Sequence, residues 1–149
     1  MIGTIVFLGW LLGIERLKYL PPDAIVMLPN TALGFTAGGL ALWLLRREPS
    51  GTTSRRVGRT LAAGVLLLGL VSFIERVTGL DAGIDRLLFA EILSHYPYRP
   101  VGLMATNSTV AFALAGASLL TLDKETRRGW RPSQLLATLG LAIATLALV

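Results

Sequence analysis

The side chains that could do chemistry in this 149-residue chain are few, and two candidate pairs repeat. Glu15–Arg16 and Glu75–Arg76 each follow an isoleucine, in the same Ile-Glu-Arg order, within long apolar segments. A carboxylate in such a segment could hold a proton or a polar ligand, because buried charges in apolar spans are costly and usually functional. The same pairs could instead reach the interface, or form a structural clamp in which Glu15 meets Arg76 and Glu75 meets Arg16.

Two asparagines complete this candidate polar cluster. Asn30 and Asn107 stand near the start of two apolar segments, and each is followed by Thr or Ser. Their side chains could act as N-caps that accept hydrogen bonds from exposed helix N–H groups. Beside the Ile-Glu-Arg elements, they would give one end of a helix bundle a ring of polar groups.

Other kinds of chemistry lack the residues they need. Cysteine is absent, which excludes disulfides, thiolate metal sites and thiol catalysis. His95 is the only histidine, and no metalloprotease, phosphate-loop or dinucleotide-loop motif occurs. We therefore expect no catalytic activity, no metal site and no cofactor.

The elements that carry these residues are apolar blocks. Hydrophobic residues make up 53% of the chain and charged residues 15%, whereas soluble domains have about 25% charged residues. The blocks cover residues 2–20, 28–45, 60–80, 102–122 and 133–149. Since a helix needs about 20 residues to cross the hydrocarbon core, the sequence predicts an all-α integral membrane protein with five transmembrane helices.

The charge distribution predicts the orientation of these helices. Nine of the 14 basic residues fall in residues 46–59 and 123–132, the two connections expected on one side. By the positive-inside rule these connections and the N-terminus are cytoplasmic in a multi-pass arrangement. The net charge of +5 is then a topology signal, and no nucleic-acid partner is expected.

An internal repeat links the blocks. Residues 27–48 and 104–125 align without gaps and are identical at 7 of 22 positions, while residues 8–20 and 68–80 share the Ile-Glu-Arg element. We interpret the chain as one membrane domain, 1–149, built from duplicated helix hairpins. Repeat one covers about 2–48, repeat two about 60–125, and 133–149 would start a third, which suggests a fragment of something longer.

Small residues recur four apart on several predicted helices, a spacing that allows close packing in membranes. The three pairs are Gly9 and Gly13, Gly34 and Gly38, and Ala111 and Ala115. The longer outer connection, residues 82–95, has the pattern of a short amphipathic helix lying in the interface. It would serve as a cover for the bundle mouth or as a lid over a ligand pocket, and its key residues are Asp81, Asp85, Leu87, Leu88 and Phe89.

Residues 27–45, 74–89 and 104–120 together resemble a bacterial membrane sensor region found upstream of PAS, histidine-kinase or GGDEF modules. The matching positions are Pro29, Asn30, Thr31, Ala32, Asp81, Gly83, Ile84, Asp85, Leu87, Leu88 and Phe89. In the second repeat Thr106 replaces the proline and Ser108 the threonine, so only Asn107 is retained there. The resemblance implies a sensory input module in the bacterial inner membrane, without naming its stimulus.

Three functions follow from these observations. The first is a sensory input module of a signal-transduction protein, whose output domain would lie outside this chain. The alternative is a structural or accessory subunit of a larger membrane assembly, such as a photosynthetic or respiratory complex. A small transporter ranks last, because the spans lack charges at their midpoints. Expected partners are the lipid bilayer, other membrane subunits or a second copy, and a small-molecule ligand of unknown identity.

Overall fold

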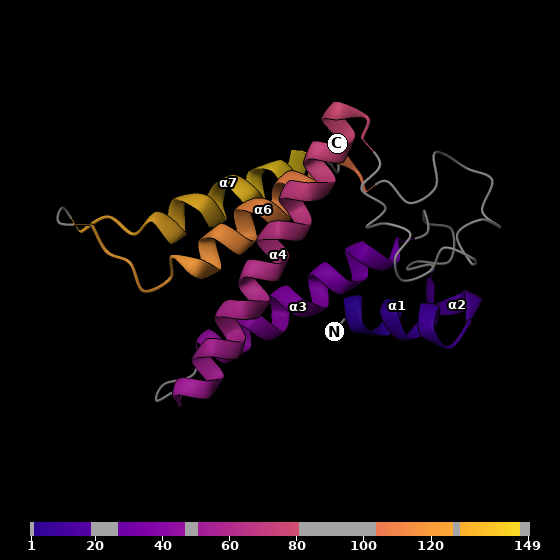
Figure 1. Ribbon diagram of the computed structural model, residues 1–149, viewed down its shortest axis with the longest axis horizontal. Coiled ribbons are helices and arrows are strands. Elements are labelled where there is room, and N and C mark those ends of the chain that lie inside the picture. The colour runs from indigo at the N-terminus through magenta and orange to yellow at the C-terminus, as the bar shows by residue number, and fades with distance from the viewer. Residues whose placement is uncertain (1, 19–26, 47–50, 81–103, 127–128, 147–149) are drawn as a thin grey trace.

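The computed structural model describes residues 2–18, 27–46, 51–80, 104–126 and 129–146, and within these ranges it contains helices and no strands. The helices are α1 (Ile2–Leu11), α2 (Glu15–Lys18), α3 (Pro29–Leu45), α4 (Thr52–Thr78), α6 (Thr106–Leu120) and α7 (Pro132–Leu146), as Figure 1 shows. The predicted all-α class is confirmed for this part of the chain.

Local sequence explains where several helices begin and end. Proline is the first residue of α3 and of α7, where its fixed φ suits a helix and its missing N–H is not needed. Helix α4 ends at Thr78 and is capped by Gly79, whose φ of 70° is the left-handed conformation typical of a helix C-terminus. Gly13 has a φ of 66° and turns the chain between α1 and α2.

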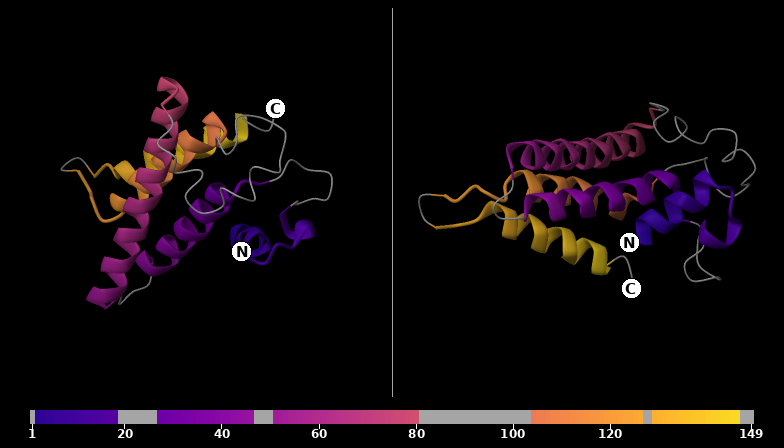
Figure 2. Two further views of the ribbon diagram at one scale, coloured as in Figure 1. Left: turned by 45° about the vertical axis from the view of Figure 1, so that its right-hand side comes forward. Right: turned by 90° about the horizontal axis from the view of Figure 1, so that it is seen from below.

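Four helices form the body of the fold. Helix α4 packs against α3 and α6, α6 packs against α7, and α1 packs against α3 and α2. The right-hand view of Figure 2 shows α3, α4, α6 and α7 side by side. The basic ends of α3 and α4 lie at the same end of the molecule as the connection between α6 and α7. We call this the basic end.

The tightest packing lies where α4 crosses α6. A Cβ atom added at Gly69 would lie 2.7 Å from the carbonyl oxygen of Thr109. One added at Gly116 would lie 2.7 Å from the Cα atom of Leu66. The two backbones are therefore in direct contact, which only glycine permits at these positions.

Two small apolar clusters accompany these contacts. One joins Val6, Trp10 and Ala32 between α1 and α3, and the other joins Val65, Met104 and Phe112 beside α4 and α6. Trp10 donates a hydrogen bond of 2.9 Å from Nε1 to the carbonyl oxygen of Met27, and its ring lies 4.6 Å from the Lys18 ammonium nitrogen. Most other large apolar side chains in the described ranges are exposed.

The five predicted membrane-spanning helices are not supported by helix length. Among the described helices only α4, with 27 residues, is long and apolar enough to cross a membrane. Helix α1 has 10 residues because the turn at Gly13 ends the first apolar block early, and α6 and α7 have 15 residues each. The length of an apolar block therefore does not fix the length of its helix: α1 is shorter than the block 2–20, and α4 is longer than the block 60–80.

The repeated segments adopt similar but unequal structures. Helices α3 and α6 begin at Pro29 and Thr106, which are aligned in the repeat. The two Ile-Glu-Arg elements differ, because the first falls in the short α2 after a turn and the second falls in the last turns of the continuous α4. The predicted outer amphipathic segment lies outside the described residues, as does much of the connection that contains it.

Candidate functional site

The two Ile-Glu-Arg elements that would form the Glu–Arg clamp lie on different helices, α2 and α4. Helices α2 and α4, which carry the two Ile-Glu-Arg elements, do not contact each other in the described structure. Glu75 is 4% exposed on the face of α4 that is buried in the bundle, while Arg76 and Arg16 are exposed. The side chain of Glu15 lies outside what the structure describes. The Glu–Arg clamp and the ring of polar groups therefore stay predictions.

The expectation that Asn30 and Asn107 act as N-caps is wrong. The N-cap residues of α3 and α6 are Leu28 and Ala105, and neither helix has a side-chain cap. Each asparagine is the second residue of its helix. Asn30 is 4% exposed, whereas Asn107 is exposed and lines a cavity described below.

The predicted packing residues fall into different environments. A Cβ at Gly34 would lie 2.9 Å from the Phe112 ring, and one at Gly9 would lie 2.6 Å from the Cβ of Leu17. Gly38 is in ordinary contact with Val65, at 3.9 Å, and Gly13 has no neighbour within 4 Å because it serves the turn. Four of the six predicted packing positions line one cavity, two from α3 and two from α6: Gly34, Gly38, Ala111 and Ala115. The outer-segment residues Asp81, Asp85, Leu87, Leu88 and Phe89 lie outside the described residues.

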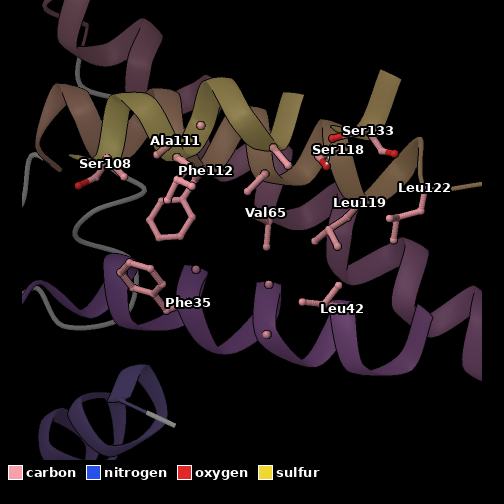
Figure 3. Close-up of a pocket in the computed structure, with 18 of the residues that line it drawn as sticks. Phe35, Leu42, Val65, Ser108, Ala111, Phe112, Ser118, Leu119, Leu122 and Ser133 are labelled. Carbon is pink, nitrogen blue, oxygen red and sulfur yellow. Dashed lines mark hydrogen bonds between the residues drawn. The ribbon is translucent and has the colours of Figure 1, made fainter. Parts of the chain in front are cut away.

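This cavity is the candidate site, and we call it the groove. It has a volume of about 790 Å³ and lies between α3, α6 and α7, with Val65 of α4 also in its wall. Figure 3 shows Phe35 and Leu42 reaching from α3 toward side chains on the facing helices. Helices α3 and α7 do not contact each other, so only α6 connects the two sides of the groove.

Equivalent residues of the two repeats line the groove together. Phe35 and Phe112 meet edge to face, with ring centroids 5.0 Å apart and planes at 68°. This arrangement is favourable for aromatic rings. The aligned pairs that share the wall are Gly34 and Ala111, Phe35 and Phe112, Gly38 and Ala115, and Leu42 and Leu119. The groove is therefore a site formed between repeats, with small residues providing its volume.

Polar groups mark the two ends of the groove. Asn107 and Ser108 lie at the start of α6, away from the basic end. At the opposite end, Ser118 donates a hydrogen bond of 2.8 Å from Oγ to the carbonyl oxygen of Ser133, and Gln134 also lines the wall. The groove thus has an apolar middle and a polar group at each end.

An ion-pair cluster adjoins the Ser133 end. The carboxylate of Asp123, which directly follows the wall residue Leu122, accepts from Arg55 at 2.5 Å and from Arg59 at 3.2 Å. The hydrogen bond from Arg55 is the main cause that lowers the pKa of Asp123 below its ordinary value of 3.8. These contacts fasten the start of α4 to the α6–α7 connection.

The described wall of the groove is mostly apolar, and its polar side chains are those of Asn107, Ser108, Ser118, Ser133 and Gln134. Within the described ranges no three acidic or histidine side chains come close enough to hold a metal ion. Sequence reasoning identified the small residues of α3 and α6 but missed those of α7. The sequence does contain a pattern that indicates them, because small residues recur there every three to four positions. These residues, Ser133, Ala137, Gly140 and Ala144, all line the groove.

Comparison with known proteins adds no relative: no family model, curated protein or solved structure matches this chain.

Proposed function

We propose that this chain is a membrane-embedded sensory input module, and that the groove between α3, α6 and α7 receives its stimulus as an apolar ligand. The observation that carries the proposal is a cavity of about 790 Å³ whose two outer walls, α3 and α7, make no contact with each other. That volume is in the range of small-molecule sites. An occupant that contacts both walls would favour one spacing of the helices over another.

Membrane placement rests on where the apolar side chains lie. Only 28% of the most apolar stretch of α4 is buried, whereas the core helix of a soluble protein would be mostly buried. Leu67 on α4 and Leu141 and Leu146 on α7 are likewise exposed. Exposed apolar area of this extent favours lipid or a partner over water.

The shorter helices are compatible with this placement at a modest cost. Helices of 15 to 17 residues extend about 22–26 Å, against about 30 Å of hydrocarbon. Local thinning of the bilayer accommodates a mismatch of this size. Helix α1, at about 15 Å, reaches only half of the core depth, so the proposal places α4 as the full span with α3, α6 and α7 beside it.

Thiol labelling tests the orientation, with the basic end proposed to be cytoplasmic. The chain has no cysteine, so a single introduced thiol gives an unambiguous signal. Lys124→Cys should react with an impermeant maleimide only in inverted membrane vesicles, and Leu80→Cys, beyond the other end of α4, only in spheroplasts. Labelling of both from the same side would refute the spanning arrangement.

Distance measurements test the sensing step. Spin labels at Leu40→Cys on α3 and Leu139→Cys on α7 sit on exposed positions outside the groove wall. In proteoliposomes, added hexadecane should shift or narrow their distance distribution measured by double electron–electron resonance. A control pair at Leu40→Cys and Leu67→Cys joins the directly packed α3 and α4 and should not change. Identical distributions for the test pair with and without hexadecane would refute the proposal.

A further inference from the structure

The two ends of the groove differ in charge, and this difference indicates an orientation for its occupant. At the Asn107 end the wall carries neutral polar side chains. The other end adjoins the ion-pair cluster of Asp123, Arg55 and Arg59, and the pair between Arg131 and Glu125, whose atoms are 3.8 Å apart. With Lys124, these exposed residues comprise four cations and two anions, so this end is net positive.

The backbone adds to the positive electrostatic potential at this end of the groove. Arg131 directly precedes the first residue of α7, so the positive end of that helix dipole lies beside Ser133 and Gln134. The dipole of α7 therefore favours an anion near this end of the cavity. Of the first residues of α7, Pro132 has no N–H, and the Gln134 N–H donates to the Arg131 carbonyl oxygen at 3.1 Å. A ligand with one apolar chain and one anionic head group would satisfy both parts at once.

We infer that, if the groove is a sensing site as proposed, its ligand is a long-chain carboxylate whose chain lies along α6 and whose head group lies at the Ser133 end. From Ser108 to Leu119 the wall follows α6 for about 17 Å. The acyl chain of one leaflet spans about 15 Å, half of the hydrocarbon core, so a single chain fits with room for its head group. The net positive charge distinguishes this ligand from a neutral alkane or alcohol.

Equilibrium binding of tritiated palmitate to the purified full chain in non-ionic detergent tests the inference. We expect saturable binding that hexadecanol, with the same chain and no charge, displaces at least tenfold more weakly than unlabelled palmitate. Dioleoyl phosphatidylglycerol, an anionic lipid with two chains, should also compete at least tenfold more weakly. These competitions use the unaltered protein, so they do not depend on any variant folding.

A matched pair of variants locates the binding. Ala137 lines the groove, whereas Ala142 is exposed on the same helix outside its wall. Ala137→Trp should weaken palmitate binding at least tenfold, and Ala142→Trp should leave it within twofold. Circular dichroism of both variants checks that the helices are retained.

The outcomes separate this inference from the proposed function. Equal competition by hexadecanol, equal competition by phosphatidylglycerol, or equal binding by the two tryptophan variants would each overturn the carboxylate assignment. Absence of palmitate binding would do the same, while a hexadecane-dependent change between α3 and α7 would still support groove sensing. If neither palmitate binding nor that distance change occurs, both proposals fail.

Discussion

The crossing of α4 and α6 gives the sharpest test of the packing argument, because two glycines there face backbone rather than flexible side chains. Gly69→Ala would place its Cβ 2.7 Å from the Thr109 carbonyl oxygen, and Gly116→Ala would place its Cβ 2.7 Å from the Leu66 Cα. Real Cβ atoms do not approach other heavy atoms this closely. Each substitution must therefore push the two helices apart.

The magnitude follows from two opposing terms. Alanine in place of glycine within a helix stabilises it by up to about 1 kcal/mol. Overpacking at a tight contact costs about 1–3 kcal/mol. Gly64→Ala, on the same helix α4, should gain the helix stabilisation without the overpacking cost, since nothing lies within 4 Å of its added Cβ. The difference between Gly69→Ala and Gly64→Ala should thus be a loss of about 1–3 kcal/mol.

Chemical unfolding in detergent, followed by circular dichroism, measures this difference directly. Gly116→Ala has its own control in Gly39→Ala, the aligned position of repeat one, where nothing lies within 4 Å. The double variant at positions 69 and 116 should cost less than the two single losses combined, because the first clash already separates the helices. If Gly69→Ala and Gly116→Ala are as stable as their controls, the close crossing is refuted.

Three further predictions concern single contacts. Asp123→Asn should lower the free energy of unfolding by about 0.2–1 kcal/mol at neutral pH. This advantage of the wild type should be complete above pH 3.8 and should disappear as the pH falls through the lowered pKa of Asp123. Unfolding curves of both proteins over a pH series measure the loss. Phe112→Ala should cost about 3–5 kcal/mol in the same unfolding assay, and Phe35→Ala clearly less, because their side chains are 6% and 55% exposed. Trp10→Phe should lower the free energy of unfolding by about 0.5–1.5 kcal/mol through the lost hydrogen bond, and an unchanged value would argue against that bond.

The sequence was sufficient for the helical class and for the small residues that α3 and α6 contribute to the groove. Apolar blocks with glycine and alanine at four-residue spacing required helices that pack closely, and Gly34 indeed faces the Phe112 ring. It was insufficient for helix ends, because an apolar block continues through a turn without a change in hydropathy. The glycine at position 13 looked like a packing residue, but its positive φ makes it the residue that ends α1.

The repeat in the sequence also does not predict how the helices of the two repeats pack, as their contacts show. Aligned by their Ile-Glu-Arg elements, Gly9 of α1 corresponds to Gly69 of α4. Gly69 faces Thr109 and Ala113 on α6, whose aligned residues on α3 are Ala32 and Thr36. The residue of α1 that faces Ala32 and Thr36 is Gly3, six positions earlier than Gly9.

Helix α1 is therefore displaced along α3 by about 9 Å relative to the placement of α4 on α6, since each residue adds about 1.5 Å. This shift moves α1 away from the basic end, which leaves Gly39 without a neighbour where its counterpart Gly116 meets α4. Residues that align in the two repeats can therefore pack against different neighbours. Identical Glu–Arg pairs at aligned positions need not lie at the same depth or contact the same partner.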